Sequence, residues 1–93
     1  MKIALAAAAL LASPQVCAFQ SAQGDSVVVS YADLNLSSAS DRAILEARVE
    51  RAINHVCGVD RSERQLTQRR ESERCVNETT PNALAAINAV LAQ

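Results

Sequence analysis

The chain of 93 residues has almost no aromatic side chains and no large excess of charge of either sign. It contains one tyrosine, one phenylalanine and no tryptophan, and its formal net charge is −1. A hydrophobic core built from this composition must be largely aliphatic. The near-neutral charge gives no electrostatic footprint for nucleic acid or an anionic membrane, so we expect neither as a partner.

Long hydrophobic runs are also missing, apart from one near the N-terminus. That run covers residues 3–12 and is too short to cross a membrane, because a spanning helix needs about twenty apolar residues. It follows a short positive start, and Val16 and Ala18 then stand at the −3 and −1 positions of a cleavage site. We therefore predict a signal peptide over residues 1–18, cleaved before Phe19. The protein would be exported to the periplasm or secreted, without a stable membrane anchor.

Cleavage there would leave two of the three cysteines. Cys17 would leave with the signal peptide, whereas Cys57 and Cys75 would meet an oxidising compartment, where one disulfide is the simplest interpretation. A chain this short gains little stability from its core alone. A disulfide that closes a loop of this size is worth about 3 kcal/mol. We predict that it staples a hairpin of two helices.

The mature chain is predicted to be one small domain over residues 26–93, preceded by a flexible tail over residues 19–25. Val27, Val29 and Tyr31 fall on one face of a strand, and no second strand of comparable quality is evident. A lone strand leaves backbone donors and acceptors unpaired. We therefore predict that this edge pairs with a second copy of the chain or with a strand of an unknown protein partner.

The rest of the domain is predicted to be helical. Between residues 37 and 57 the apolar side chains repeat with helical spacing at Leu45, Val49, Ala52, Ile53 and Val56. Gly58 suits the C-terminal cap of this helix. A polar helix over residues 63–77 follows, and Thr80-Pro81 is typical of the start of a third. The last two are alternatively one bent helix, so the fold class is mainly α (α+β), with one strand and two or three helices.

Three stretches of the chain are similar to segments of one known family. They are Val-Ser-Tyr-Ala-Asp-Leu-Asn-Leu-Ser-Ser at residues 29–38, Val-Cys-Gly at residues 56–58 and Arg-Cys at residues 74–75. In these stretches the chain resembles the UrcA family of small exported bacterial proteins, and the resemblance covers nearly the whole predicted mature chain. It implies export and a paired arrangement of cysteines. It implies no catalytic residue, and we predict no cofactor.

No group of residues has the spacing of a catalytic or metal site. His55 and Cys57 are two positions apart on a helix, so their side chains diverge by about 200°, and a disulfide-bonded cysteine is not a nucleophile. A metal site made of His55, Cys57 and Cys75 lacks an obvious fourth ligand. Asp33 is best explained as a turn or cap residue. The interleaved arginines and glutamates are typical of a solvated surface.

We therefore predict an exported protein that is not an enzyme: a binding module or envelope-stress accessory protein with an unknown ligand. The alternative is a thiol–disulfide or metal-handling protein that uses Cys57 and Cys75. A working redox pair would have a reduction potential above about −300 mV, whereas a structural bond would lie below it. A small enzyme is a third interpretation, but it needs a concave pocket that a short aliphatic core can hardly enclose.

Overall fold

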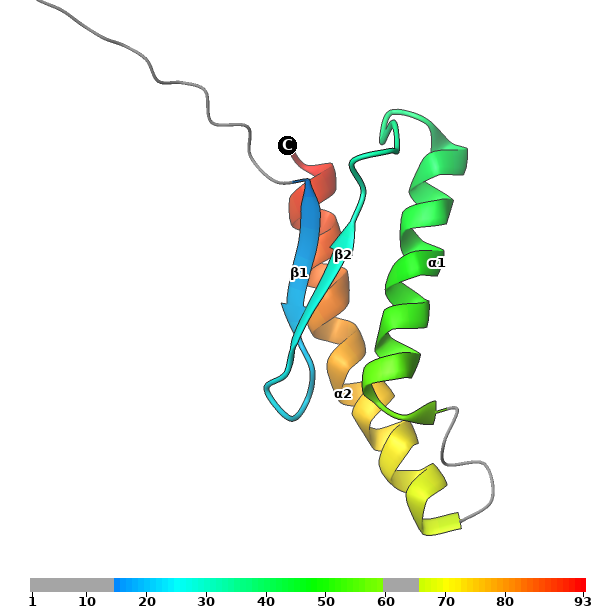
Figure 1. The fold of residues 1–93 in the computed structure, drawn as a ribbon. Helices are drawn as coiled ribbons and strands as arrows, with labels where there is room; N and C mark the ends of the chain where they lie inside the picture. The colour runs from blue at the N-terminus through cyan, green and yellow to red at the C-terminus, as the bar shows by residue number, and fades with distance from the viewer. Residues whose placement is uncertain (1–14, 60–65) are drawn as a thin grey trace, which may run out of the picture.

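The computed structural model describes residues 15–59 and 66–93. In them the chain forms two strands and two helices, in the order β1 (Val16–Gln20), β2 (Ser26–Ser30), α1 (Ala39–Val56) and α2 (Leu66–Leu91). The strands form an antiparallel hairpin that lies across α2, and α1 runs beside β2 (Figure 1). The fold is α+β, with a two-stranded sheet packed on a pair of helices.

The strand predicted from the sequence is β2, and it pairs with β1 in the same chain. In the register of the hairpin, Cys17 stands opposite Val29 and Phe19 opposite Val27. All four side chains are buried in the core. The prediction of an unpaired strand is therefore wrong, because the segment just before the turn supplies the partner.

A tight turn over residues 21–25 closes the hairpin, so the prediction of a flexible tail over residues 19–25 is also wrong. The Ser21 N–H donates to the Asp25 C=O at 2.8 Å, and the Gly24 N–H donates to the Ser21 C=O at 2.9 Å. Gly24 has a φ of 89°, a left-handed conformation that glycine adopts without strain and that three-residue hairpin loops commonly use. One glycine in a polar stretch thus allows the chain to reverse.

α1 confirms the predicted first helix, including its C-terminal cap at Gly58. The Ser38 side chain accepts a hydrogen bond from the Asp41 N–H, as an N-cap residue does. At the other end Gly58, with a φ of 69°, follows Cys57. The side of α1 that faces the core carries the buried Leu45, Val49 and Ile53 and the partly buried Ala52 and Val56.

α2 is one continuous helix, so a third helix starting at Thr80-Pro81 does not occur. Proline has no N–H to donate to the carbonyl four residues earlier, which is that of Asn77. Pro81 and Asn77 are both exposed, so this carbonyl is open to water and the helix accommodates the proline on its wet side. The Thr80 hydroxyl also donates to the Val76 C=O at 2.7 Å. The helix start predicted at residue 63 lies outside the described residues.

One core joins the hairpin to both helices. Leu45 is 0% exposed, Cys17 and Ala83 are each 1% exposed, and the two aromatic side chains, Phe19 and Tyr31, are buried with them. The core is thus aliphatic around two rings, and one of the rings comes from the predicted N-terminus of the mature chain. In the described ranges, neither helix combines the length and the apolar character needed to span a membrane.

Candidate functional site

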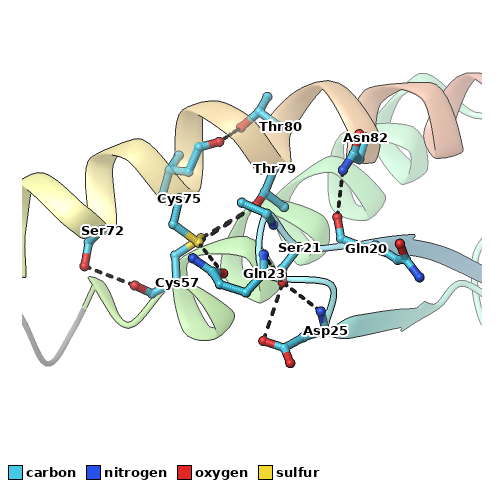
Figure 2. The surroundings of a disulfide bond; sticks show 12 residues. Gln20, Ser21, Gln23, Asp25, Cys57, Ser72, Cys75, Thr79, Thr80 and Asn82 are labelled. Atoms are coloured by element: carbon cyan, nitrogen blue, oxygen red, sulfur yellow. Dashed lines mark hydrogen bonds between the residues drawn. A yellow bond between two sulfur atoms is a disulfide. The ribbon is translucent and has the colours of Figure 1, made fainter.

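The Cys57–Cys75 disulfide joins the end of α1 to α2, which confirms the predicted staple. The two Cα atoms are 5.5 Å apart, within the range of ordinary disulfides. Cys75 is 3% exposed. The Ser72 hydroxyl donates to the Cys57 C=O at 3.0 Å, so a hydrogen bond supports the same connection (Figure 2).

Thr79 connects this disulfide to the turn of the hairpin (Figure 2). Its side chain is 0% exposed. Its Oγ1 atom accepts the Ala22 N–H at 2.9 Å and lies 3.9 Å from the sulfur atoms of both Cys57 and Cys75. The Gln23 Oε1 atom lies 3.5 Å from the Cys75 sulfur. One buried hydroxyl therefore holds the turn against the bond that joins the two helices, and it is itself hydrogen-bonded, as buried polar groups must be.

The surroundings of the disulfide favour a structural bond over a reactive one. A hollow of about 540 Å³ beside it is lined by two acidic side chains, Asp25 and Glu71, and by no basic one among residues 15–59 and 66–93. A reactive cysteine is normally found near positive charge, which stabilises the thiolate. Acidic neighbours do the opposite, and the burial of Cys75 restricts access to its sulfur. In the part of the chain that the structure describes, no side chain beside the sulfurs would stabilise a thiolate.

His55 does not join the two cysteines. It is exposed in the last turn of α1, whereas Cys57 turns toward α2 to form the disulfide. Within residues 15–59 and 66–93, no three histidine, cysteine, aspartate or glutamate side chains come together in a way that could hold a metal ion. Of the three candidate ligands in the sequence, the structure brings together only the two that are bonded to each other.

Cys17 is a free thiol in the core and not a residue outside the domain. It is 1% exposed, and burial raises the pKa of its thiol, so it stays protonated and unreactive near neutral pH. Val16, Cys17 and Ala18 are three of the five residues of β1. Cleavage between Ala18 and Phe19 would therefore remove most of this strand together with a side chain of the core.

Asp33 lies in a turn, as the sequence indicates, and also forms an ion pair that the sequence does not indicate. Its carboxylate accepts two hydrogen bonds from the Arg48 guanidinium, at 2.8 and 2.7 Å, and these lower the pKa of Asp33 to about 2. The same guanidinium donates to the Ser30 C=O at 3.0 Å. Arg48 therefore ties α1 to the end of β2 across a separation that no local pattern reveals.

The two outer edges of the hairpin carry backbone N–H and C=O groups that are not paired within the hairpin. Hydrogen bonds from the Tyr31 N–H to the Gln15 C=O and from the Ser21 N–H to the Asp25 C=O close the two ends of the ladder. Because the pairing alternates in an antiparallel ladder, odd-numbered residues face the partner strand and even-numbered residues point outward. The backbone groups of Val27, Val29 and Tyr31, the predicted pairing edge, thus face β1. The outward groups belong to Val16, Ala18 and Gln20 on β1 and to Ser26, Val28 and Ser30 on β2.

Each outer edge is capped at one carbonyl by a side chain from a helix. On β1 the Asn82 amide donates to the Gln20 C=O at 2.9 Å (Figure 2), and on β2 Arg48 donates to the Ser30 C=O. In the part of the chain that the structure describes, the backbone groups of Val28 at the centre of β2 have no partner beyond the hairpin. Its side chain is 61% exposed. Among the described residues, the middle of this edge therefore carries backbone groups without a hydrogen-bond partner.

Comparison with known proteins identifies no relative: no family model matches the chain, and neither a curated protein nor a solved structure is significantly similar to it. The resemblance to the UrcA family accordingly remains a prediction from the sequence.

Proposed function

We propose that the protein is an exported, non-enzymatic binding module that adds an extended segment of a partner to the outer edge of β2. The observation that supports this proposal is the open backbone at Val28, beside a side chain that is 61% exposed. An added strand would satisfy these groups with main-chain hydrogen bonds, and Val28 would supply an apolar contact on the outer face of the sheet. The partner is a second copy of the chain or a strand of another exported protein.

The proposal also requires β1 to be present, because β2 needs a partner on its inner edge. We infer that export processing cuts ahead of Gln15 and not after Ala18, since cleavage after Ala18 would remove Val16, Cys17 and Ala18 of β1, and Cys17 fills the core. The intact mass of the exported protein tests this inference. A mass that includes Cys17 supports it, whereas a chain that begins at Phe19 contradicts it.

Proline substitutions at the two outer edges provide a direct test. Val28→Pro removes an outward N–H from β2 and leaves the ladder to β1 intact, since proline is tolerated at a strand position whose N–H faces solvent. Ala18→Pro is the matched control because it makes the same change on the outer edge of β1. Sedimentation equilibrium at high micromolar concentration measures self-association. Co-purification from periplasm measures binding to another protein.

We expect Val28→Pro to abolish the association and Ala18→Pro to preserve it. A protein that is monomeric at high micromolar concentration excludes the second copy as the partner. If Val28→Pro also retains every co-purifying partner of the wild type, strand addition at β2 is excluded altogether.

A further inference from the structure

A groove between α1 and α2 opens on the side of the helix pair that faces away from the hairpin. Arg48 and Asn82 each bond to the hairpin, and residues two positions further along the same helices, Glu50 and Leu84, point about 200° away from them. The groove has a volume of about 380 Å³. Its lining consists of Glu46, Val49, Glu50, Ile53, Asn54, Val76, Thr80, Ala83, Leu84 and Ile87.

The floor of this groove is apolar, and one wall carries an uncovered leucine. Val49, Ile53 and Ile87 form the floor and are 3 to 6% exposed, so they belong to the core of the protein. Leu84 rises from α2 and is 53% exposed. The Thr80 hydroxyl is already occupied, because it donates to the Val76 C=O at 2.7 Å. An occupant would thus meet apolar surface with few polar groups to orient it.

The opposite wall is acidic. Glu46 and Glu50 lie one turn apart on α1 and both are exposed. Like charges at this spacing disfavour a helix by a few tenths of a kcal/mol. Arg42, one turn before Glu46, does not neutralise the pair, because its guanidinium turns away and donates to the Leu36 C=O at 3.3 Å. No basic side chain lines the groove among the described residues.

We propose that this groove binds a basic amphipathic helix of a partner protein. Apolar side chains on one face of that helix would cover Leu84 and the floor, and lysines or arginines beside them would pair with Glu46 and Glu50. A helix suits the groove because it satisfies its own backbone hydrogen bonds, whereas an extended segment would find no strand edge there. A second copy docking by the same face would bring its own two glutamates into the contact, so charge disfavours it.

Two fluorescent peptides of about 18 residues, long enough for five helical turns, serve as probes. One is an amphipathic helix of leucine and lysine, and the other has glutamate in place of every lysine. Fluorescence anisotropy measures the affinity of each peptide for the purified full-length protein. We expect the basic peptide to bind at least about tenfold more tightly than the acidic one. Equal affinities, or no binding of either peptide, would overturn the proposal.

Charge reversal on the acidic wall identifies the site. Glu46→Lys with Glu50→Lys should weaken the basic peptide at least about tenfold and strengthen the acidic one. The matched control, Glu71→Lys with Glu78→Lys, makes the same change in net charge on the opposite side of α2. All four side chains are exposed, so the fold should persist, which circular dichroism checks. A control pair that weakens binding as much as the groove pair would show nonspecific attraction and overturn the proposal.

A second pair of variants tests the apolar contact. Leu84→Ser should weaken the basic peptide by about tenfold, because it removes the apolar wall. Ile44→Ser is the control, since Ile44 is 42% exposed on α1 and does not line the groove. An unchanged affinity for Leu84→Ser contradicts helix docking here. Because Val28→Pro leaves this face untouched, failure at the groove and failure at the edge of β2 are separate results.

Discussion

The two strands of the hairpin play the same structural part but differ in what the sequence says of them. Both bury alternate side chains against the helices, and Cys17 of β1 stands opposite Val29 of β2. β2 is flanked by polar residues, so its alternation predicts a strand. β1 follows an apolar run, and its outward residues Val16 and Ala18 have the small side chains of a cleavage site. Val16 and Ala18 therefore fit both a strand and a cleavage site. Only the inward-facing side chains, Cys17 and Phe19, distinguish a strand from a cleavage site.

The largest effect is expected from a truncation that removes most of β1. A chain that begins at Phe19 should lose at least about 4 kcal/mol of stability relative to one that begins at Gln15. The loss comes from the core position of Cys17, from the uncovered Val29 and from the Tyr31 N–H, whose acceptor is the Gln15 C=O. Urea unfolding followed by circular dichroism measures the difference. Equal midpoints would mean that β1 does not belong to the domain.

Loss of the disulfide should affect both strands together. Replacing Cys57 and Cys75 by serine is expected to destabilise the protein by about 3 kcal/mol, the value for a loop of this length. The turn between the strands is held on Thr79 beside this bond, so neither strand should melt alone. Thermal unfolding with and without reductant measures the effect in the wild type, and the serine variant should not respond to reductant. Separate transitions for hairpin and helices would contradict this coupling.

Paired substitutions sharpen the comparison inside the core. Cys17→Ser and Val29→Thr each place a hydroxyl at opposite positions of the hairpin without a large change in volume. If the strands are equivalent, each variant should lose about 2 kcal/mol, the cost of burying an unpaired hydroxyl. Ala18→Ser, at an exposed position of the same strand, is the control and should change stability by less than about 0.5 kcal/mol. Chemical denaturation would contradict equivalence if Cys17→Ser behaved like this control.

The smallest expected effect is on the ion pair that holds the end of β2. Arg48 lowers the pKa of Asp33 from 3.8 to about 2 in the folded state. The pair therefore contributes its full stability above a pH of about 4, and the contribution is lost as the pH falls through 2. The advantage of the wild type over Asp33→Asn should shrink over this interval, as measured by urea midpoints. Glu50→Gln, an exposed change on the same helix as Arg48, is the control. If the difference in urea midpoint between the wild type and Asp33→Asn did not change with pH, the ion pair between Asp33 and Arg48 would be contradicted.

Local signals predicted α1 and the disulfide well. Ser38 and Gly58 mark the two ends of α1, and its buried face follows from spacing alone. Local signals failed where packing decides the outcome. Pro81 is typical of a helix start, but the surrounding core holds α2 continuous on both sides of it. A turn signal did exist at Gly24, in the polar stretch that separates the two strands.

The contacts that build the candidate site are mostly distant in sequence. Ala22 and Thr79 are 57 positions apart, and Arg48 and Asp33 are 15 apart, so neither pair forms a motif. The open edge at Val28 could be placed only once β1 fixed which backbone groups face outward. Without that partner strand, the sequence assigned the pairing edge to Val27, Val29 and Tyr31.

Amide hydrogen exchange tests most directly whether β1 is part of the folded domain. The measurement is made by NMR on a chain that retains Gln15 onward. We predict that the amides of Cys17 and Val29 exchange at least about a hundredfold more slowly than those of Ala18 and Val28, because only the odd-numbered amides face a partner strand. If Cys17 exchanges as fast as Ala18 while α1 remains protected, the strand is not formed and the account is contradicted.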